Sequence, residues 1–317
     1  MKGQLIMKKL TYLISAIAAG LFTSAHAEVS VSGSASVVYQ SAGSDTNIHN
    51  GGAVSFGLST TTASGMTVST SAGITNSTTS GASGAVTGWD NLTFATGGVT
   101  LTVGNDIGLP DGVGEVGGLV GDTAAVNSAG ITSTTGLTDD EGSGISLTTS
   151  LGGAGLSVYY VADSDPATSA VAGVGDIDGA TGTGSGVKIT TAVGDVGLTV
   201  AYAAHSDTGI DDTETAASAS YAMGAGTISA GYTTSTGTND GNSFGIAYSM
   251  SLDADTSLGI GYQSHNVNSN SGRATDVTIS RAMGGGMSVF AEMRSTSGDT
   301  AAAGENSTMA IGTSVSF

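Results

Sequence analysis

The sequence contains no cysteine, and its seven lysines and arginines stand against 26 aspartates and glutamates. A protein without cysteine that is exported must be stable without disulfides. The shortage of bases excludes phosphate-backbone recognition as a main activity, so a nucleic acid is not an expected partner. Aromatic residues make up only 5% of the chain, which would make a single compact soluble core of this size poor.

Long apolar runs are also missing, except at the N-terminus. There Lys8 and Lys9 precede the apolar run 10–22, which Ala25-His26-Ala27 follows. This order of a basic segment, an apolar segment and an A-x-A site predicts a secretory signal peptide over residues 1–27, cut after Ala27. No other stretch approaches the roughly 20 apolar residues of a membrane helix. The exported chain is therefore either soluble or a membrane β-barrel.

Removal of the signal peptide would leave 317 − 27 = 290 residues and make the chain more acidic still. Three of the seven bases lie in residues 1–27, so the mature net charge is 4 − 26 = −22. Such a surface favours contact with cations, or carboxylates bridged by divalent ions.

The pattern that is present is a period-2 alternation of apolar and small polar residues, typical of β-strands. It begins at Val29, recurs in sixteen segments and ends at Phe317. Seven short turns and eight longer loops, the first over Ser41–Gly52, alternate between the segments. An even strand number with one short and one long set of connections predicts an all-β fold, a transmembrane antiparallel β-barrel of sixteen strands over residues 28–317. A secreted or surface β-solenoid or adhesin is the alternative, although it predicts a fixed repeat length.

Aromatic residues on the apolar face lie near the strand ends. One set precedes long loops, and the other lies near short turns or the C-terminus. We predict that the two sets form girdles at the two membrane interfaces. The first set is Tyr39, Tyr160, Tyr202, Tyr232 and Tyr262; the second is Phe94, Tyr221, Tyr248 and Phe317.

The stretch Asn105–Ser143 is a long central run without strand-like alternation. A loop of this length between short strands is uncommon and usually functional. It is rich in acids, namely Asp106, Asp111, Glu115, Asp122, Asp139, Asp140 and Glu141.

Two local motifs resemble the Gram-negative general porin family, whose members are trimeric channels of sixteen strands. The strand Ser307–Phe317 ends in a terminal phenylalanine, similar to the assembly signal of the family. The segment 111–118, DGVGEVGG, resembles the family motif D-x-x-P-E-F-G-G, with Gly114 in place of the proline and Val116 in place of the phenylalanine. The resemblance implies an outer-membrane channel, a homotrimer, and a third loop that folds into the lumen with Asp111 and Glu115 lining the constriction.

The opposite wall departs from the family pattern, in which arginines on early strands face the acidic loop. The first five predicted strands contain no lysine or arginine. The charges found in the inward phase are Lys188, Glu292 and Arg294, whereas Arg281 falls in the lipid-facing phase, where it would snorkel or meet another subunit. Since pore width and wall charge set selectivity, we expect a passive channel for small hydrophilic solutes that prefers cations.

Other chemistry finds little support in the sequence. The acidic pairs Asp163/Asp165 and Asp176/Asp178, like Asp211-Asp212-x-Glu214, are placed in external loops, where their oxygens suit weak calcium binding. A hydrolase is not expected, because the adjacent residues His205-Ser-Asp207 cannot form a triad, which is assembled in space. We expect no other cofactor and no enzymatic activity.

Overall fold

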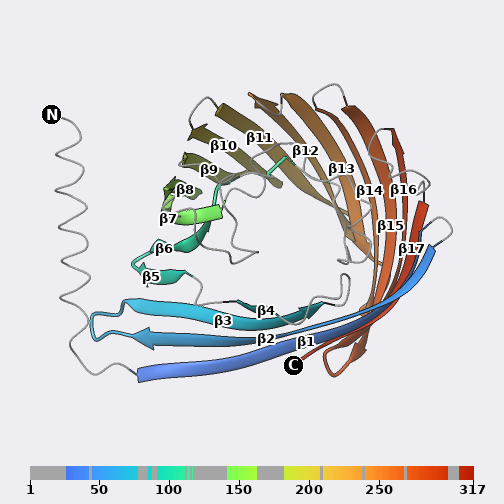
Figure 1. Cartoon of the computed structure of the whole chain (residues 1–317), viewed down its shortest axis with the longest axis horizontal. Helices are drawn as coiled ribbons and strands as arrows, with labels where there is room; N and C mark the ends of the chain where they lie inside the picture. Colours follow the sequence, from blue (N-terminus) through green and yellow to red (C-terminus); the bar gives the residue numbers. More distant parts are fainter. Residues whose placement is uncertain are drawn as a thin grey trace.

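The computed structural model describes residues 26–42, 45–77, 85–87, 91–110, 113, 114, 116, 141–162, 182–207, 210–237, 240–267, 270–298 and 307–317. The regular structure in these ranges consists of β-strands (Figure 1). The strands are β1 (His26–Ala42), β2 (Asp45–Thr61), β3 (Thr67–Ser77), β4 (Ala85–Thr87), β5 (Leu92–Thr96), β6 (Val99–Gly108), β7 (Glu141–Leu151), β8 (Ala154–Ala162), β9 (Thr183–Val193), β10 (Val196–Asp207), β11 (Ile210–Met223), β12 (Gly226–Thr236), β13 (Gly241–Ser251), β14 (Thr256–Val267), β15 (Asn270–Gly284), β16 (Met287–Gly298) and β17 (Ser307–Ser316). In this part of the chain, no helix is long and apolar enough to cross a membrane.

The strands form one closed antiparallel sheet. Apart from β4 and β5, each strand pairs with its neighbours in sequence, and β1 pairs with both β2 and β17, so the first and last strands meet. The short strands β4 and β5 both pair with β3 and occupy one position in the ring, which therefore has sixteen positions. The prediction of a sixteen-stranded antiparallel barrel is confirmed, and a solenoid, which does not close on itself, is excluded.

Short turns join the strands at one end of the ring. The turn between β5 and β6 is Gly97-Gly98, with φ of 55° and 79°. Positive φ at both central residues is the geometry of a type I′ turn, whose twist matches that of the two flanking strands. The Gly-Gly dipeptide in the sequence therefore predicts this hairpin correctly.

The long-loop end differs from the sequence prediction. The expected loop Ser41–Gly52 is mostly strand, because β1 extends to Ala42 and β2 starts at Asp45. Likewise β11 starts at Ile210, so Asp212 and Glu214 belong to a strand and not to an external loop. These strand ends lack apolar alternation, the property on which the prediction depended, while the backbone pairing continues through them.

The two faces of the sheet differ in chemistry. Large apolar side chains point outwards and remain exposed, as for Val37 at 49%, Ile189 at 45% and Val200 at 52%. Hydroxyls lie on the inside and pair across strands, as between Thr148 Oγ1 and Ser157 Oγ at 2.9 Å. A continuous apolar outer surface marks contact with a membrane or partner, since soluble monomers rarely expose so much.

Candidate functional site: the inner wall and the long loop

A β-bulge in β6 starts the long loop. Gly104 pairs with Gly144 and Ile107 pairs with Gly142, so Asn105 and Asp106 together oppose one residue of β7. A bulge adds one residue to one strand and changes the direction of the side chains after it. Ile107 consequently points into the ring, where it is 3% exposed.

The side chain of Asn91 holds this bulge. Its amide Nδ2 donates to the carbonyl of Asp106, and its Oδ1 accepts from the N–H of Asp106 at 3.2 Å. Asn91 thus satisfies both backbone groups that the bulge removes from strand pairing. Gly104 permits the approach, because a Cβ there would overlap the Asn91 side chain.

An apolar cluster inside the ring anchors the first residues of the loop. Ile107 and Leu109 are buried against Val161 of β8 and Ala203 of β10, with Tyr159 packed beside them. The neighbouring strand β9 has glycines where the loop packs against it. A Cβ at Gly184 would press on Leu109, and a Cβ at Gly186 would overlap Pro110. The loop therefore leaves β6 along the inner wall of β8–β10.

Further along, the loop reaches β12 and β13. Gly114 is buried and lies against the backbone of Tyr232 and the hydroxyl of Thr233 in β12, and the carbonyl of Val116 lies against Gly245 in β13. Figure 1 shows β6 and β13 on opposite sides of the ring. A segment that starts on one and contacts the other lies within the enclosed space.

An ion pair forms part of the inner wall at β15 and β16. Arg294 Nε donates to Asp276 Oδ2 at 2.9 Å, and the two side chains are 5% and 0% exposed. They lie directly opposite each other in the strand pairing. Glu292, 2% exposed, is the next inward residue of β16. This wall carries two carboxylates and one guanidinium.

A second charged group lies on β9–β11. His205 of β10 pairs with Asp212 of β11, and Glu214 is the next inward residue of β11; all three are buried. Lys188 of β9 places its Nζ 5.9 Å from the centre of the Tyr159 ring. The sequence prediction missed Asp212, Glu214 and Asp276, although their period-2 spacing from Ala216 and Thr278 could have identified their inward phase.

The other predicted constriction residues are only partly visible. Asp106 lies exposed in the β6 bulge. Asp111, Glu115, Asp122, Asp139 and Asp140 lie outside the described residues, as does the side chain of Glu141, whose backbone starts β7. The proposed calcium residues Asp163, Asp165, Asp176 and Asp178 also lie outside them. Within the described ranges, no group of three or more acids, histidines or cysteines could hold a metal ion.

The predicted girdle residues lie on the outer face. Tyr39, Tyr160, Tyr202 and Tyr232 are exposed near the long-loop end, and Tyr221 is exposed near the short-turn end, whereas Tyr262, Phe94 and Tyr248 are half-buried. At the seam, the N–H and carbonyl of Phe317 bond the carbonyl and N–H of Gly33 at 3.0 and 2.9 Å. The terminal residue thus extends the pairing of β17 with β1.

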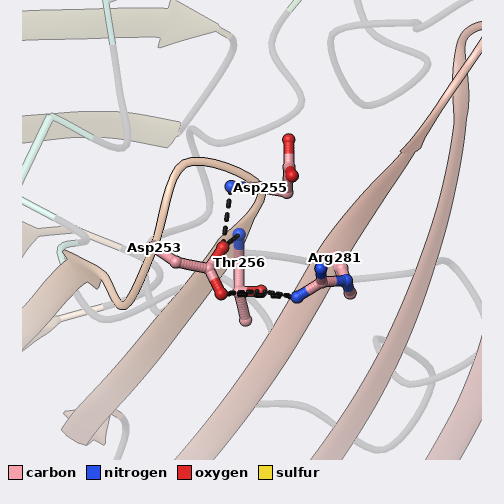
Figure 2. A network of polar contacts seen from close by, with 4 residues as sticks. All are labelled: Asp253, Asp255, Thr256 and Arg281. Atoms are coloured by element: carbon pink, nitrogen blue, oxygen red, sulfur yellow. Dashed lines mark hydrogen bonds and ion pairs between the residues drawn. The ribbon is translucent and has the colours of Figure 1, made fainter.

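Arg281 lies on the outer face near the short-turn end, as its phase predicted, but it is engaged in an ion pair (Figure 2). Its Nη1 contacts Asp253 Oδ2 at 3.3 Å and donates to Thr256 Oγ1 at 2.7 Å. Asp253 also accepts the backbone N–H groups of Asp255 and Thr256, both at 2.8 Å. The hydrogen bond from Asp255, followed by those from Thr256 and the charge of Arg281, lowers the pKa of the Asp253 carboxyl below its usual 3.8.

The sequence profile of the Gram-negative porin family matches residues 14–315. The chain belongs to this family. It is therefore an outer-membrane channel and not an enzyme. In such barrels the short turns are periplasmic and the longer loops external.

Solved porins share this fold. A loop-deletion mutant of OmpT from Vibrio cholerae has a TM-score of 0.68 at 13% identity, over 92% of this chain and 99% of that one. A porin refined at 1.8 Å has a TM-score of 0.68 at 16% identity, over 92% and 100%. An engineered porin of Rh. blastica has a TM-score of 0.65 at 17% identity, over 92% of this chain and 100% of that one. No curated protein sequence matched the chain.

Proposed function

We propose that this porin is a water-filled channel for passive diffusion of small hydrophilic solutes and that it prefers cations. In this proposal the long loop narrows the pore, and Asp111 and Glu115 line the narrow zone. The described part of the loop supports this, since it runs inside the ring from β6 to β12 and β13.

The charge of the inner wall is the observation that carries the cation preference. The described strands place four carboxylates on this wall, those of Asp212, Glu214, Asp276 and Glu292. The lysines and arginines of these strands on the same wall are Lys188 and Arg294, and the Arg294 guanidinium is already paired with Asp276. The wall is therefore net negative before the acids of the loop are added.

A channel with walls of one charge sign concentrates ions of the opposite sign. Low-dielectric walls strengthen this effect because they focus the field into the aqueous space. Cations would therefore enter more readily than anions of the same size, while neutral solutes would be selected by width alone. No arginine-lined surface opposes the acids, since the described β1–β6 contain no lysine or arginine.

Reversal potentials in planar bilayers under a salt gradient test this proposal. The variant Asp111→Asn/Glu115→Gln should lower the cation-over-anion permeability ratio, because it removes two charges from the narrow zone. Asp253→Asn is the matched control, since it removes a carboxylate from a turn on the outer face. Unchanged reversal potentials in the double variant would contradict the role of these two acids.

We also propose that the channel is a homotrimer in the outer membrane and that residues 1–27 are cleaved as a signal peptide. OmpT of Vibrio cholerae, which shares the fold, was solved in a trimer form. The two girdles of aromatic residues and the assembly role of Phe317 belong to the same proposal. Native mass spectrometry of the purified protein measures both the oligomeric state and the mass after cleavage.

A further inference from the structure

Two facing glycines form a side-chain-free patch on the inner wall. Gly231 of β12 and Gly245 of β13 are direct partners in the strand pairing, and both are buried. A Cβ at Gly245 would overlap the carbonyl oxygen of Val116, and one at Gly231 would overlap the carbonyl of Gly114. A Cβ at Gly231 would also lie 2.7 Å from Cγ2 of Val116. The loop backbone therefore lies directly on the strand backbone at this patch.

On the loop side of the contact, Gly114 likewise has no side chain. A Cβ at Gly114 would overlap the Tyr232 carbonyl and the Thr233 hydroxyl, so neither side of the contact has room for a side chain. A hydrogen bond from the N–H of Val116 to the carbonyl of Gly114, 2.9 Å long, holds this part of the loop in a tight turn. Thr233 beneath it is 0% exposed.

We propose that Gly231 and Gly245 are a seat that fixes how far the loop projects into the lumen and thereby determines the width of the pore. This proposal rests on the proposed function, in which the loop narrows the channel. The Asn91 contacts and the Ile107–Leu109 cluster hold the start of the loop independently. The seat holds the next part of the loop, Gly114 and Val116. Because Gly231 and Gly245 have no side chains, the loop backbone lies directly on the wall at this point. Any side chain at the seat would displace it towards the axis.

Thiol labelling tests the seat directly, because the chain contains no cysteine. Val116→Cys introduces a single reporter in a half-buried position. We expect Gly245→Val to speed its reaction with a charged thiol reagent about tenfold, equivalent to about 1.4 kcal/mol of lost docking free energy. Gly114→Val changes only the loop and should have the same effect with every strand unaltered.

The control is Gly57→Val in the same reporter background. Gly57 lies on the inner face of β2, where a Cβ would meet only the rotatable hydroxyl of Ser30 within 3 Å. This variant should label like the parent. Heat-modifiable migration on gels verifies that each variant forms a barrel, and single-channel conductance measures the pore.

The two readouts separate the seat from the proposed function. Faster labelling with lower conductance in Gly245→Val and Gly114→Val supports both. Unchanged labelling in both folded variants would overturn the seat. Faster labelling with unchanged conductance would leave the seat in place and contradict the proposal that this loop narrows the pore.

Discussion

Asp276 is the residue that balances the Arg294 guanidinium in the β15–β16 wall. Both side chains are almost completely buried, and their hydrogen bond is 2.9 Å long. Burying a charge is costly unless it is paired and hydrogen-bonded. The pair therefore contributes little net stability through its attraction. Loss of one partner would be costly, because the other charge would stay buried.

Asp276→Asn should destabilise the barrel by about 3 kcal/mol, because it leaves the Arg294 guanidinium buried without this carboxylate. It should also lower the cation-over-anion permeability ratio, since the wall loses a negative charge. Urea unfolding and reversal potentials measure the two effects.

Thr278→Ala is the matched control for this variant. Thr278 Oγ1 makes only a 3.4 Å contact with Asp276 Oδ1, so its loss should cost less than about 1 kcal/mol. Equal stability of Asp276→Asn and wild type would mean that Glu292, on the same wall, balances Arg294 by itself.

At the residue scale, period-2 phase was a good guide where the strand limits were right. It predicted the inward orientation of Lys188, Glu292 and Arg294. It missed Asp276 because the apolar alternation of this strand is first seen at Val277, whereas β15 starts at Asn270. A charged residue at an inward position adds no apolar alternation, so the pattern alone does not extend the strand to include it.

At the element scale, the β13–β14 turn shows how one side chain can organise a connection. Asp253 accepts two backbone N–H groups of its own turn and contacts Arg281 of β15, as Figure 2 shows. The carbonyl of Asp255 also accepts the N–H of Ala282 at 2.8 Å. The turn is thus tied to the neighbouring strand on the periplasmic side of the barrel.

These contacts predict a pH-dependent stability. The folded state lowers the pKa of Asp253, so its carboxylate adds stability that is fully present above pH 3.8 and is lost as the pH falls through the folded value. Asp253→Asn should therefore have a lower unfolding temperature than wild type at neutral pH. The difference should shrink as the pH falls below 3.8. Thermal unfolding in detergent at a series of pH values measures it.

Asp255→Asn provides the control for this series. It removes the same charge from the same turn, but the hydrogen bond of Asp255 to Asp253 in Figure 2 and that of its carbonyl to Ala282 are made by the backbone and remain. Its unfolding temperature should follow that of wild type. A difference between Asp253→Asn and wild type that stays constant down to the lowest pH would show that shape, and not ionisation, explains the effect.

The elements themselves were predictable in number but not in extent. Some of the short turns contain glycine pairs that specify their geometry, as at Gly97-Gly98 and Gly152-Gly153. The β6 bulge had no local signal, because it depends on Asn91, which lies on the preceding segment and pairs with Asp106 only once β5 and β6 are adjacent.

At the scale of the whole molecule, the excess of acids should make the channel sensitive to salt. The Debye length is about 30 Å at 0.01 M and about 3 Å at 1 M ionic strength. The inner-wall acids should therefore affect passing ions strongly in dilute salt and weakly in concentrated salt. We expect the cation-over-anion permeability ratio to fall steadily as salt rises.

Reversal potentials at several mean salt concentrations and a fixed gradient ratio measure this dependence. The variant Asp111→Asn/Glu115→Gln should show a weaker dependence, because fewer charges remain to be screened. A ratio that does not change with salt would point to selection by width and not by wall charge.

The amino-acid pattern is enough to predict a barrel, because period-two alternation and glycine turns are local properties that do not depend on which strands become neighbours. The pattern also indicates which face is polar, because successive side chains of a strand alternate between its two faces. The contacts inside the ring, in contrast, are visible only in the folded chain. Gly114 and Val116 meet Gly231 and Gly245 across more than a hundred residues of chain, and such a contact depends on closure of the whole ring, which no local pattern encodes.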